Sequence, residues 1–162
     1  KMIMIKNRWL TFLESIQVMK KFDYKNRIDK LLKDKNFSEL EDLCLKGVMI
    51  YEDAIFYYYL GVSQVNLNKI NLSIYNLEKA IFLNPKISFF YSRLAYVYLK
   101  INNLNLAKEH FKKSIDLESN NEAILIDYLK ILRELKDKDF FKQLEKALKI
   151  FPESKELKKI KD

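Results

Sequence analysis

The feature that most constrains this chain is an internal repeat. Residues 54–87 and 88–121 align over 34 positions without a gap, and residues 122–155 continue the alignment. A fixed period of this length is typical of an array of short helical hairpins, in which each hairpin buries its apolar face against its neighbours. The repeat therefore predicts an all-α solenoid of tandem antiparallel helix pairs.

The repeated positions alternate between large and small side chains, which lets two antiparallel helices approach closely. In the first unit these positions hold Tyr57, Leu60, Gly61, Ser73, Leu77 and Ala80. In the second unit they hold Tyr91, Leu94, Ala95, Ala107, Phe111 and Ser114. Proline cannot extend a helix, and the residue before it avoids the α region, so Asn84-Pro85 and Phe151-Pro152 are predicted helix stops.

The second half of the third unit is shifted by one residue. Phe140 and Ala147 lie 67 residues after Ser73 and Ala80, which is one residue less than two periods. We predict a one-residue deletion in the turn near Lys136–Lys138.

This pattern resembles the tetratricopeptide repeat family, whose first helix carries a bulky residue, Leu, a small residue and Tyr. Its second helix carries a small residue, an aromatic, a second small residue and a terminal Pro. The chain departs from the pattern where Gln64 replaces the usual Tyr, Phe140 a small residue and Ser119 the Pro. The resemblance implies a scaffold that holds another protein or peptide, with no catalytic activity.

The flanking segments are predicted from weaker patterns. Residues 23–53 are expected to form a degenerate helical hairpin, with a capping box at Ser38 and Glu41 and a helix stop at Gly47. Residues 156–162 are expected to be a C-terminal tail.

Residues 1–22 are predicted to form an amphipathic N-terminal helix. Its apolar residues recur at alternating spacings of three and four, and they are Met2, Ile5, Trp9, Phe12, Ile16 and Met19. Such a stripe needs a partner: it caps the neighbouring hairpin, forms a homodimer with its copy, docks on another protein or folds into the array's own groove. Its basic residues also suit contact with an anionic membrane surface.

The resemblance further implies that the first helices of successive units line a concave groove. From the first unit it places there Ile55, Tyr58, Val62 and Val65. The second unit contributes Phe89, Ser92, Tyr96, Leu99 and Lys100. The third unit contributes Ala123, Ile126, Asp127, Lys130 and Arg133. An aromatic and aliphatic groove of this kind suits an amphipathic helix or an extended apolar segment.

Two tyrosines are the expected anchors of this groove, Tyr58 and Tyr96, because tyrosine combines contact area with a polar group. The best-known members of the family grip the C-terminal carboxylate of chaperone tails with Lys and Asn. Tyr58 and Val62 stand where the first of those residues would be, so this mode of binding is disfavoured. The alternative for some groove side chains is packing against adjacent helices.

The net charge raises the question of nucleic acid. The formal charge is +8, from 30 basic and 22 acidic residues. The basic residues are spread along the chain, and only four are Arg, the side chain best suited to bidentate phosphate recognition: Arg8, Arg27, Arg93 and Arg133. A nucleic-acid-binding helical repeat is therefore the less favoured alternative function.

Candidate catalytic groups are few. His110 is the single histidine and Cys44 the single cysteine, so neither a paired metal site nor a disulfide within the chain is expected. With two Gly and two Pro residues, a phosphate-binding glycine loop is also not expected. We predict no enzyme activity, cofactor or metal. The compartment stays open: the cytoplasm is slightly favoured, and the periplasm or a membrane surface is the alternative if an N-terminal signal has been removed.

Overall fold

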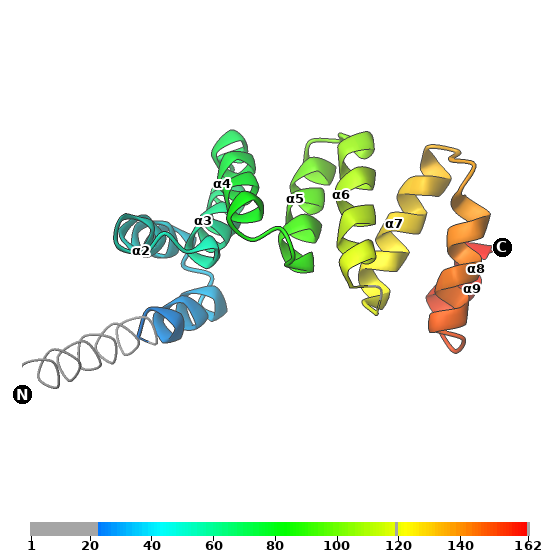
Figure 1. Cartoon of the computed structure of the whole chain (residues 1–162), viewed down its shortest axis with the longest axis horizontal. Helices are drawn as coiled ribbons and strands as arrows, with labels where there is room; N and C mark the ends of the chain where they lie inside the picture. Colours follow the sequence, from blue (N-terminus) through cyan, green and yellow to red (C-terminus); the bar gives the residue numbers. More distant parts are fainter. Residues whose placement is uncertain (1–22, 119, 162) are drawn as a thin grey trace, which may run out of the picture.

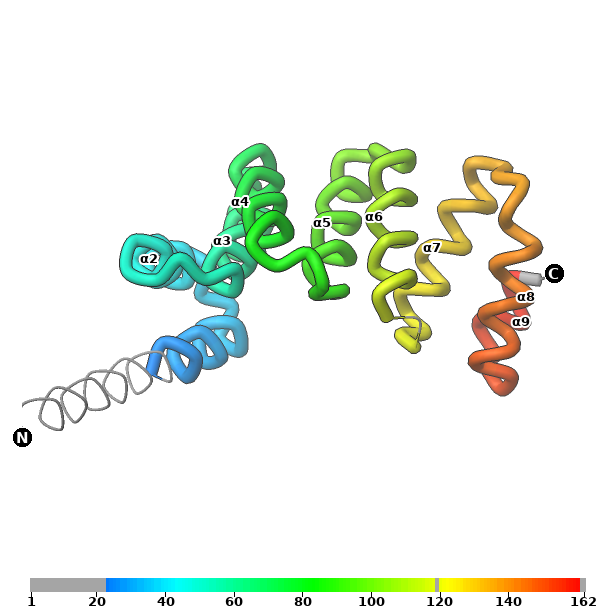
Figure 2. Tube along the Cα trace, viewed as in Figure 1, coloured from blue at the N-terminus to red at the C-terminus, as the bar shows by residue number. Residues whose placement is uncertain are grey.

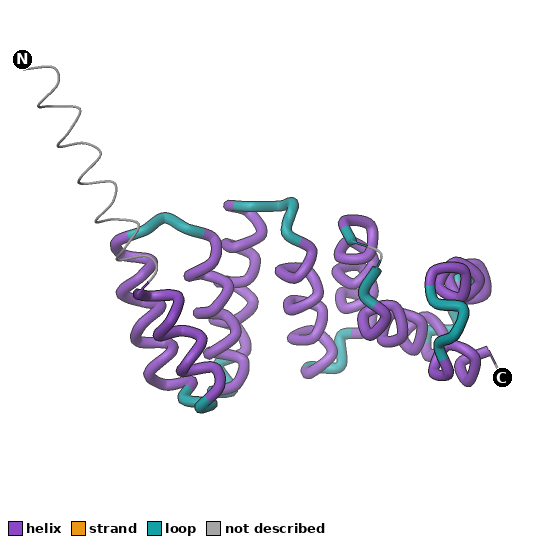
Figure 3. Tube along the Cα trace, turned by 90° about the horizontal axis from the view of Figure 1, so that it is seen from below, coloured by secondary structure: helices purple, strands orange, loops and turns teal. Residues whose placement is uncertain are grey.

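The computed structural model describes residues 23–118 and 120–161, and within these ranges every element is helical, without a strand (Figure 3). The first described helix covers residues 23–33. The helices that follow are α2 (Phe37–Ile50), α3 (Ala54–Asn66), α4 (Ile70–Leu83), α5 (Ser88–Lys100), α6 (Leu104–Leu117), α7 (Glu122–Glu134), α8 (Phe140–Ile150) and α9 (Lys155–Lys161).

Consecutive helices pack as antiparallel pairs that stand side by side along the long axis of the molecule (Figure 1). The tube in Figure 2 follows the chain from α3 and α4 through α5 and α6 to α7 and α8. The predicted all-α solenoid is therefore confirmed. The apolar stripe Ile5, Trp9, Phe12, Ile16 and Met19 lies outside the described residues.

The turn inside each pair has the same backbone geometry. Lys35, Asn68, Asn102 and Lys136 all have positive φ, between 50° and 60°. The peptide N–H after the left-handed residue reaches back across the turn, as where Asn103 donates to the Tyr98 carbonyl at 2.9 Å. This is the Schellman arrangement, which satisfies carbonyls that the end of a helix leaves without partners. The turn therefore reverses the chain without glycine.

The start of α2 differs from the sequence prediction. Its N-cap is Asn36, whose side chain accepts a hydrogen bond from the Glu39 N–H at 3.3 Å and donates to the Glu39 carboxylate at 3.0 Å. The expected capping box at Ser38 and Glu41 is wrong, because Glu41 lies inside the helix and is buried.

The predicted stop at Gly47 is also wrong, since α2 continues to Ile50. Gly47 is buried where α2 meets α3, and a Cβ added there would overlap the Phe56 ring. The glycine serves close approach of the two helices. The proline stops are confirmed, because α4 and α8 end directly before Asn84-Pro85 and Phe151-Pro152.

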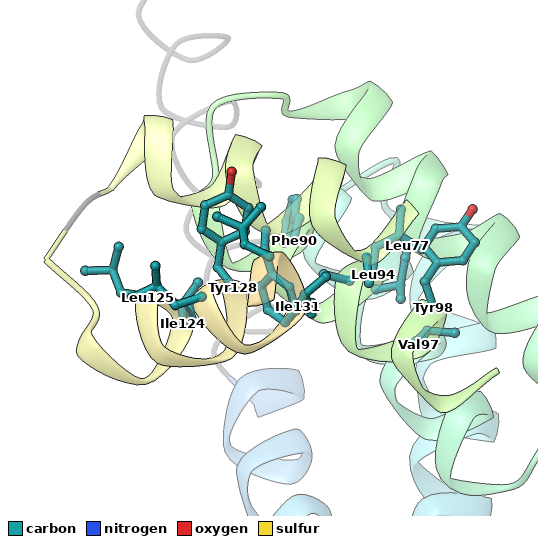
Figure 4. Packing of buried hydrophobic residues seen from close by; sticks show 14 of the residues in the cluster. Leu77, Phe90, Leu94, Val97, Tyr98, Ile124, Leu125, Tyr128 and Ile131 are labelled. Atoms are coloured by element: carbon teal, nitrogen blue, oxygen red, sulfur yellow. The ribbon is translucent and has the colours of Figure 1, made fainter. Parts of the chain in front are cut away.

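The core is continuous from pair to pair. Figure 4 shows side chains of α4, α5 and α7 packed in one cluster, including Leu77, Phe90, Leu94 and Ile131. A second cluster joins the first described helix to α2 and α3 through Phe56 and Leu60. Helix α3 contributes to both clusters, so it connects the core of the first pair to the core of the pairs that follow.

The expected C-terminal tail is folded. Residues 155–161 form α9, which packs on α7 and α8. Leu157 and Ile160 are buried, and Ser154 accepts a hydrogen bond from the Leu157 N–H at 3.1 Å. Helix α9 therefore covers the apolar side of the last pair, as a capping helix does in a repeat array.

The close contact at Gly61, within the α3–α4 pair, predicts the effect of a substitution. A Cβ at Gly61 would lie 2.6 Å from Leu77 Cγ and 3.1 Å from the Ser73 carbonyl oxygen. We expect Gly61→Ala to lower the free energy of unfolding, because overpacking of about 1–3 kcal/mol outweighs about 1 kcal/mol of gained helix propensity. Urea unfolding measures the change. Asn71→Ala, at an exposed position of α4, is the control, and equal stability of the two variants would contradict the packing argument.

Candidate functional site

The predicted groove residues lie on three neighbouring helices, α3, α5 and α7. Two cross-links hold these helices together: Tyr96 of α5 donates its hydroxyl to Asp127 of α7 at 2.7 Å, and Lys100 donates to the Val65 carbonyl of α3 at 3.0 Å. We call this surface the α3–α5–α7 face. The predicted groove residues of this face that are exposed or only partly buried are Ile55, Val65, Phe89, Tyr96, Leu99, Lys100, Ala123, Ile126, Asp127, Lys130 and Arg133.

Three predicted groove residues lie deeper than the others. Tyr58 is 8% exposed, Val62 is 5% exposed and Ser92 is 6% exposed. The Tyr58 ring stacks on Phe90, with centroids 5.2 Å apart. Tyr58 therefore supports the face from beneath, as the packing alternative anticipated, and the exposed aromatic area belongs to other residues.

Phe89 supplies part of that area. Phe89 is the second residue of α5 and is 43% exposed, whereas the next residue, Phe90, is fully buried. The Phe89 ring meets Tyr58 edge to face at 5.0 Å and Phe90 at 4.9 Å. These buried rings fix its position, so Phe89 would lose little conformational freedom on contact with a ligand.

Tyr96 lies two turns further along α5 and is 37% exposed. Its ring packs edge to face on Phe111 at 4.9 Å. Burial raises the pKa of Tyr96 to about 12, with help from its hydrogen bond to the Asp127 carboxylate, against an opposing effect of Arg93. The hydroxyl is therefore protonated at neutral pH and donates to Asp127, so this aromatic anchor is also fixed.

The charged residues of the face are partly neutralised. The Lys130 ammonium lies 3.7 Å from Asp127, the same carboxylate that accepts from Tyr96. Lys100 is held by the Val65 carbonyl. Arg133, at the end of α7, has no carboxylate within salt-bridge distance among the described residues. The face is therefore apolar at α3 and α5 and becomes cationic at the end of α7.

A buried polar network that the sequence analysis did not predict lies where α2, α3 and α4 meet. Gln64 donates to the Glu41 carboxylate at 3.2 Å, and Asn76 donates to the Gln64 carbonyl oxygen at 2.8 Å. Lys69 completes the network with a 2.6 Å salt bridge to Glu41. The signal in the sequence was Gln64 itself, which stands where the repeat pattern has Tyr.

The two side chains most capable of chemical reaction, Cys44 and His110, are packed against other residues. Cys44 is fully buried, and burial raises its thiol pKa to about 12. His110 stacks on Tyr98 with ring centroids 5.4 Å apart, and burial lowers its pKa against the opposing effects of Glu109 and Glu78. Within residues 23–118 and 120–161, no group of three or more His, Cys, Asp or Glu side chains is arranged to hold a metal ion.

Over the same part of the chain, no helix is both long enough and apolar enough to cross a membrane.

The geometry places the chain among helical-hairpin solenoids, and the comparisons with known proteins agree with that fold. Residues 90–121 match the tetratricopeptide repeat. No curated protein sequence matches the chain. The chain therefore contains a tetratricopeptide repeat at residues 90–121, within a fold of the same kind over its described helices.

Solved structures agree with this fold. YrrB, described as a TPR protein with an unusual peptide-binding site, superposes with a TM-score of 0.68 at 17% identity, over 85% of this chain and 72% of YrrB. MamA superposes with a TM-score of 0.70 at 21% identity, over 83% of this chain and 77% of MamA. The first TPR of Spaghetti, bound to an HSP90 peptide, has a TM-score of 0.66 at 22% identity, over 70% of this chain and 91% of that domain.

The polar network predicts a specific loss of stability. Glu41→Ala would leave Gln64, which is 3% exposed, without the acceptor for its amide. We expect a loss of about 1–3 kcal/mol in the free energy of unfolding, the usual cost of an unsatisfied buried polar group. Thermal or urea unfolding measures it. Asp42→Ala is the matched control, since Asp42 is exposed on the same helix, and a comparable loss there would refute the network's contribution.

His110 predicts a pH dependence that can be read directly, because it is the single histidine. Its pKa lies below the ordinary 6.5 in the folded chain, so protonation favours the unfolded state. The stability that the neutral ring contributes is present above about pH 6.5 and is lost as the pH falls below it. The imidazole proton resonance in an NMR titration gives the folded pKa, and a midpoint at or above 6.5 would contradict burial against Tyr98.

Proposed function

We propose that this protein is a non-catalytic scaffold that holds a helix or an extended apolar segment of another protein on the α3–α5–α7 face. The observation that carries the proposal is the pair of exposed aromatic rings on α5. Phe89 and Tyr96 are 43% and 37% exposed, and each is backed by buried aromatic rings. Rigid aromatic anchors of this kind dominate the free energy of many protein interfaces.

The spacing of the anchors fits a polypeptide ligand. Phe89 and Tyr96 are seven residues apart on one helix, so their side chains lie on the same face two turns apart. The small Ser92 lies between them at the intermediate turn. Half-buried Leu99 and Ile126 extend the apolar character along the face. A helix that presents apolar side chains at a similar interval matches this surface.

The neighbouring structures support the same class of function. YrrB is described as having a peptide-binding site, and the Spaghetti domain is bound to an HSP90 peptide. The chain's own anchors are aromatic and apolar, and Lys100 and Lys130 are engaged by groups of the protein itself. These features favour an apolar segment over a carboxylate terminus or a nucleic acid strand as the ligand of this face.

The test uses a displayed library of random peptides selected on the intact chain. Selected peptides should lose about tenfold or more in affinity for Phe89→Ala, because a buried aromatic anchor contributes roughly 1.5–3 kcal/mol. Phe82→Ala is the control, since Phe82 is 77% exposed on α4 and lies outside the face. Fluorescence polarisation gives the dissociation constants.

Two outcomes would argue against the proposal. Equal affinity of the selected peptides for Phe89→Ala and for the intact chain would show that they do not bind at Phe89 on α5. Tighter binding of single-stranded oligonucleotides than of any selected peptide, with a steep decrease as salt increases, would favour the nucleic-acid alternative. Circular dichroism of each variant shows that the helices are retained.

A further inference from the structure

A pocket of about 480 Å³ opens at the end of the last helix pair, where α7, α8 and α9 meet. Its apolar lining comes from all three helices: Leu132 from α7, Phe140 and Phe141 from α8, and Ile160 from α9. Leu132, Phe140 and Ile160 are buried, whereas Phe141 is 74% exposed. The pocket therefore has an apolar floor that belongs to the core and one aromatic wall that is free to meet a ligand.

The local backbone explains why the pocket lies here. Helices α4 and α6 begin two residues after the left-handed Asn68 and Asn102. Helix α8 begins at Phe140, four residues after the left-handed Lys136. The residues between Lys136 and Phe140 form a tight turn, in which the Phe140 N–H donates to the Asp137 carbonyl at 3.1 Å. Lys136 and Lys138 therefore project from a turn at the mouth of the pocket.

The rim of the pocket carries three cations, Arg133, Lys136 and Lys138. Each is exposed, and none has a carboxylate within 4.0 Å in the described part of the chain. The single acidic residue of the lining, Asp137, is already engaged. It accepts from the Asp139 N–H and from Lys108, each at 2.9 Å, and these contacts, together with the charge of Lys138, lower the pKa of its carboxyl.

We propose that this pocket binds an acidic segment of a polypeptide, with one large apolar side chain of the segment against Phe141 and its carboxylates at Arg133, Lys136 and Lys138. An apolar floor contributes binding free energy by burial, and cations around it select acidic flanking residues. Because the rim carries three positive charges, a ligand with several carboxylates fits it better than a ligand with a single negative charge.

The lining favours a side chain over a nucleobase. Leu132 and Ile160 offer aliphatic contacts, and Phe140 meets Phe141 edge to face, with ring planes at 73°. Base stacking uses flat aromatic platforms along a continuous cationic track. Here the neighbouring Lys108 and Lys130 are paired with Asp137 and Asp127. The inference goes beyond the proposed function, since the pocket shares only Arg133 with the α3–α5–α7 face.

The experiment measures fluorescence polarisation of a short labelled peptide that carries one Phe among Glu and Asp residues, bound to the whole chain. Phe141→Ala should weaken binding about tenfold, as expected when a buried aromatic contact is lost. Phe82→Ala, an equally exposed phenylalanine on α4, should leave binding unchanged. Because Phe141 is largely exposed, its removal leaves the fold intact.

The charge requirement is tested with a second matched pair of variants. Arg133→Gln with Lys138→Gln should weaken binding about tenfold at low salt, since charge-assisted contacts are among the strongest polar ones. Lys112→Gln with Lys113→Gln makes the same change in net charge on the exposed side of α6 and should have little effect. An equal loss in both double variants would show attraction by net charge alone and would overturn the site.

Other results would also overturn the proposal. These are absence of binding, equal binding of the same peptide with Ser in place of Phe, and equal or tighter binding of an oligothymidylate of the same charge. Phe89→Ala separates this site from the α3–α5–α7 face. This variant should bind the acidic peptide as the intact chain does. Weaker binding by the variant would indicate that the peptide contacts α5 and would refute the pocket as its site.

Discussion

The structure depends on the close approach of the two helices within each pair. At Gly61 no side chain separates α3 from α4, so Leu77 packs directly against the α3 backbone, and the Ser73 hydroxyl donates to the Gly61 carbonyl at 2.7 Å. The same position is Ala95 in the next pair. Because the helices are this close, each pair forms a thin layer that cannot bury its apolar residues alone, and stability comes from stacking one layer on the next.

The polar network shows how one departure from the repeat pattern is accommodated. Gln64 stands at a position that the pattern gives to an aromatic residue, and its amide is buried between Glu41 of the preceding pair and Asn76 of its own pair. A buried amide is tolerated when its donors and acceptors have partners. The network links the first pair to the second by directional bonds as well as by apolar packing, so it restricts how α2 lies against α3.

The two proposed binding surfaces differ in the physical basis of recognition. On the α3–α5–α7 face, the rings of Phe89 and Tyr96 are held by buried neighbours and by the bond to Asp127, so contact there depends on rigid apolar area. At the pocket beside α9, Phe141 lies among three cations that form no salt bridge with the described residues, so contact depends on an apolar side chain of the ligand together with acidic groups beside it. A partner that engaged both would run from α5 along α7 to Arg133, where the face becomes cationic.

The sequence by itself determined the helical solenoid, because a 34-residue period with small residues at fixed positions permits close helix pairing and little else. It also determined the stops before Pro85 and Pro152, whose cause is local. The predicted cap at Ser38 and stop at Gly47 failed because Asn36 offers the competing cap and Gly47 is needed for contact with Phe56, a residue nine positions away on the next helix. Only the tertiary structure decided which aromatic residues are exposed. Tyr58 and Phe89 are both aromatic residues predicted to line the groove, and their rings are in edge-to-face contact, but Tyr58 is buried and Phe89 is exposed. The pocket was equally hidden from the sequence, since its lining comes from the ends of three helices and exists only once α9 has folded against α7 and α8.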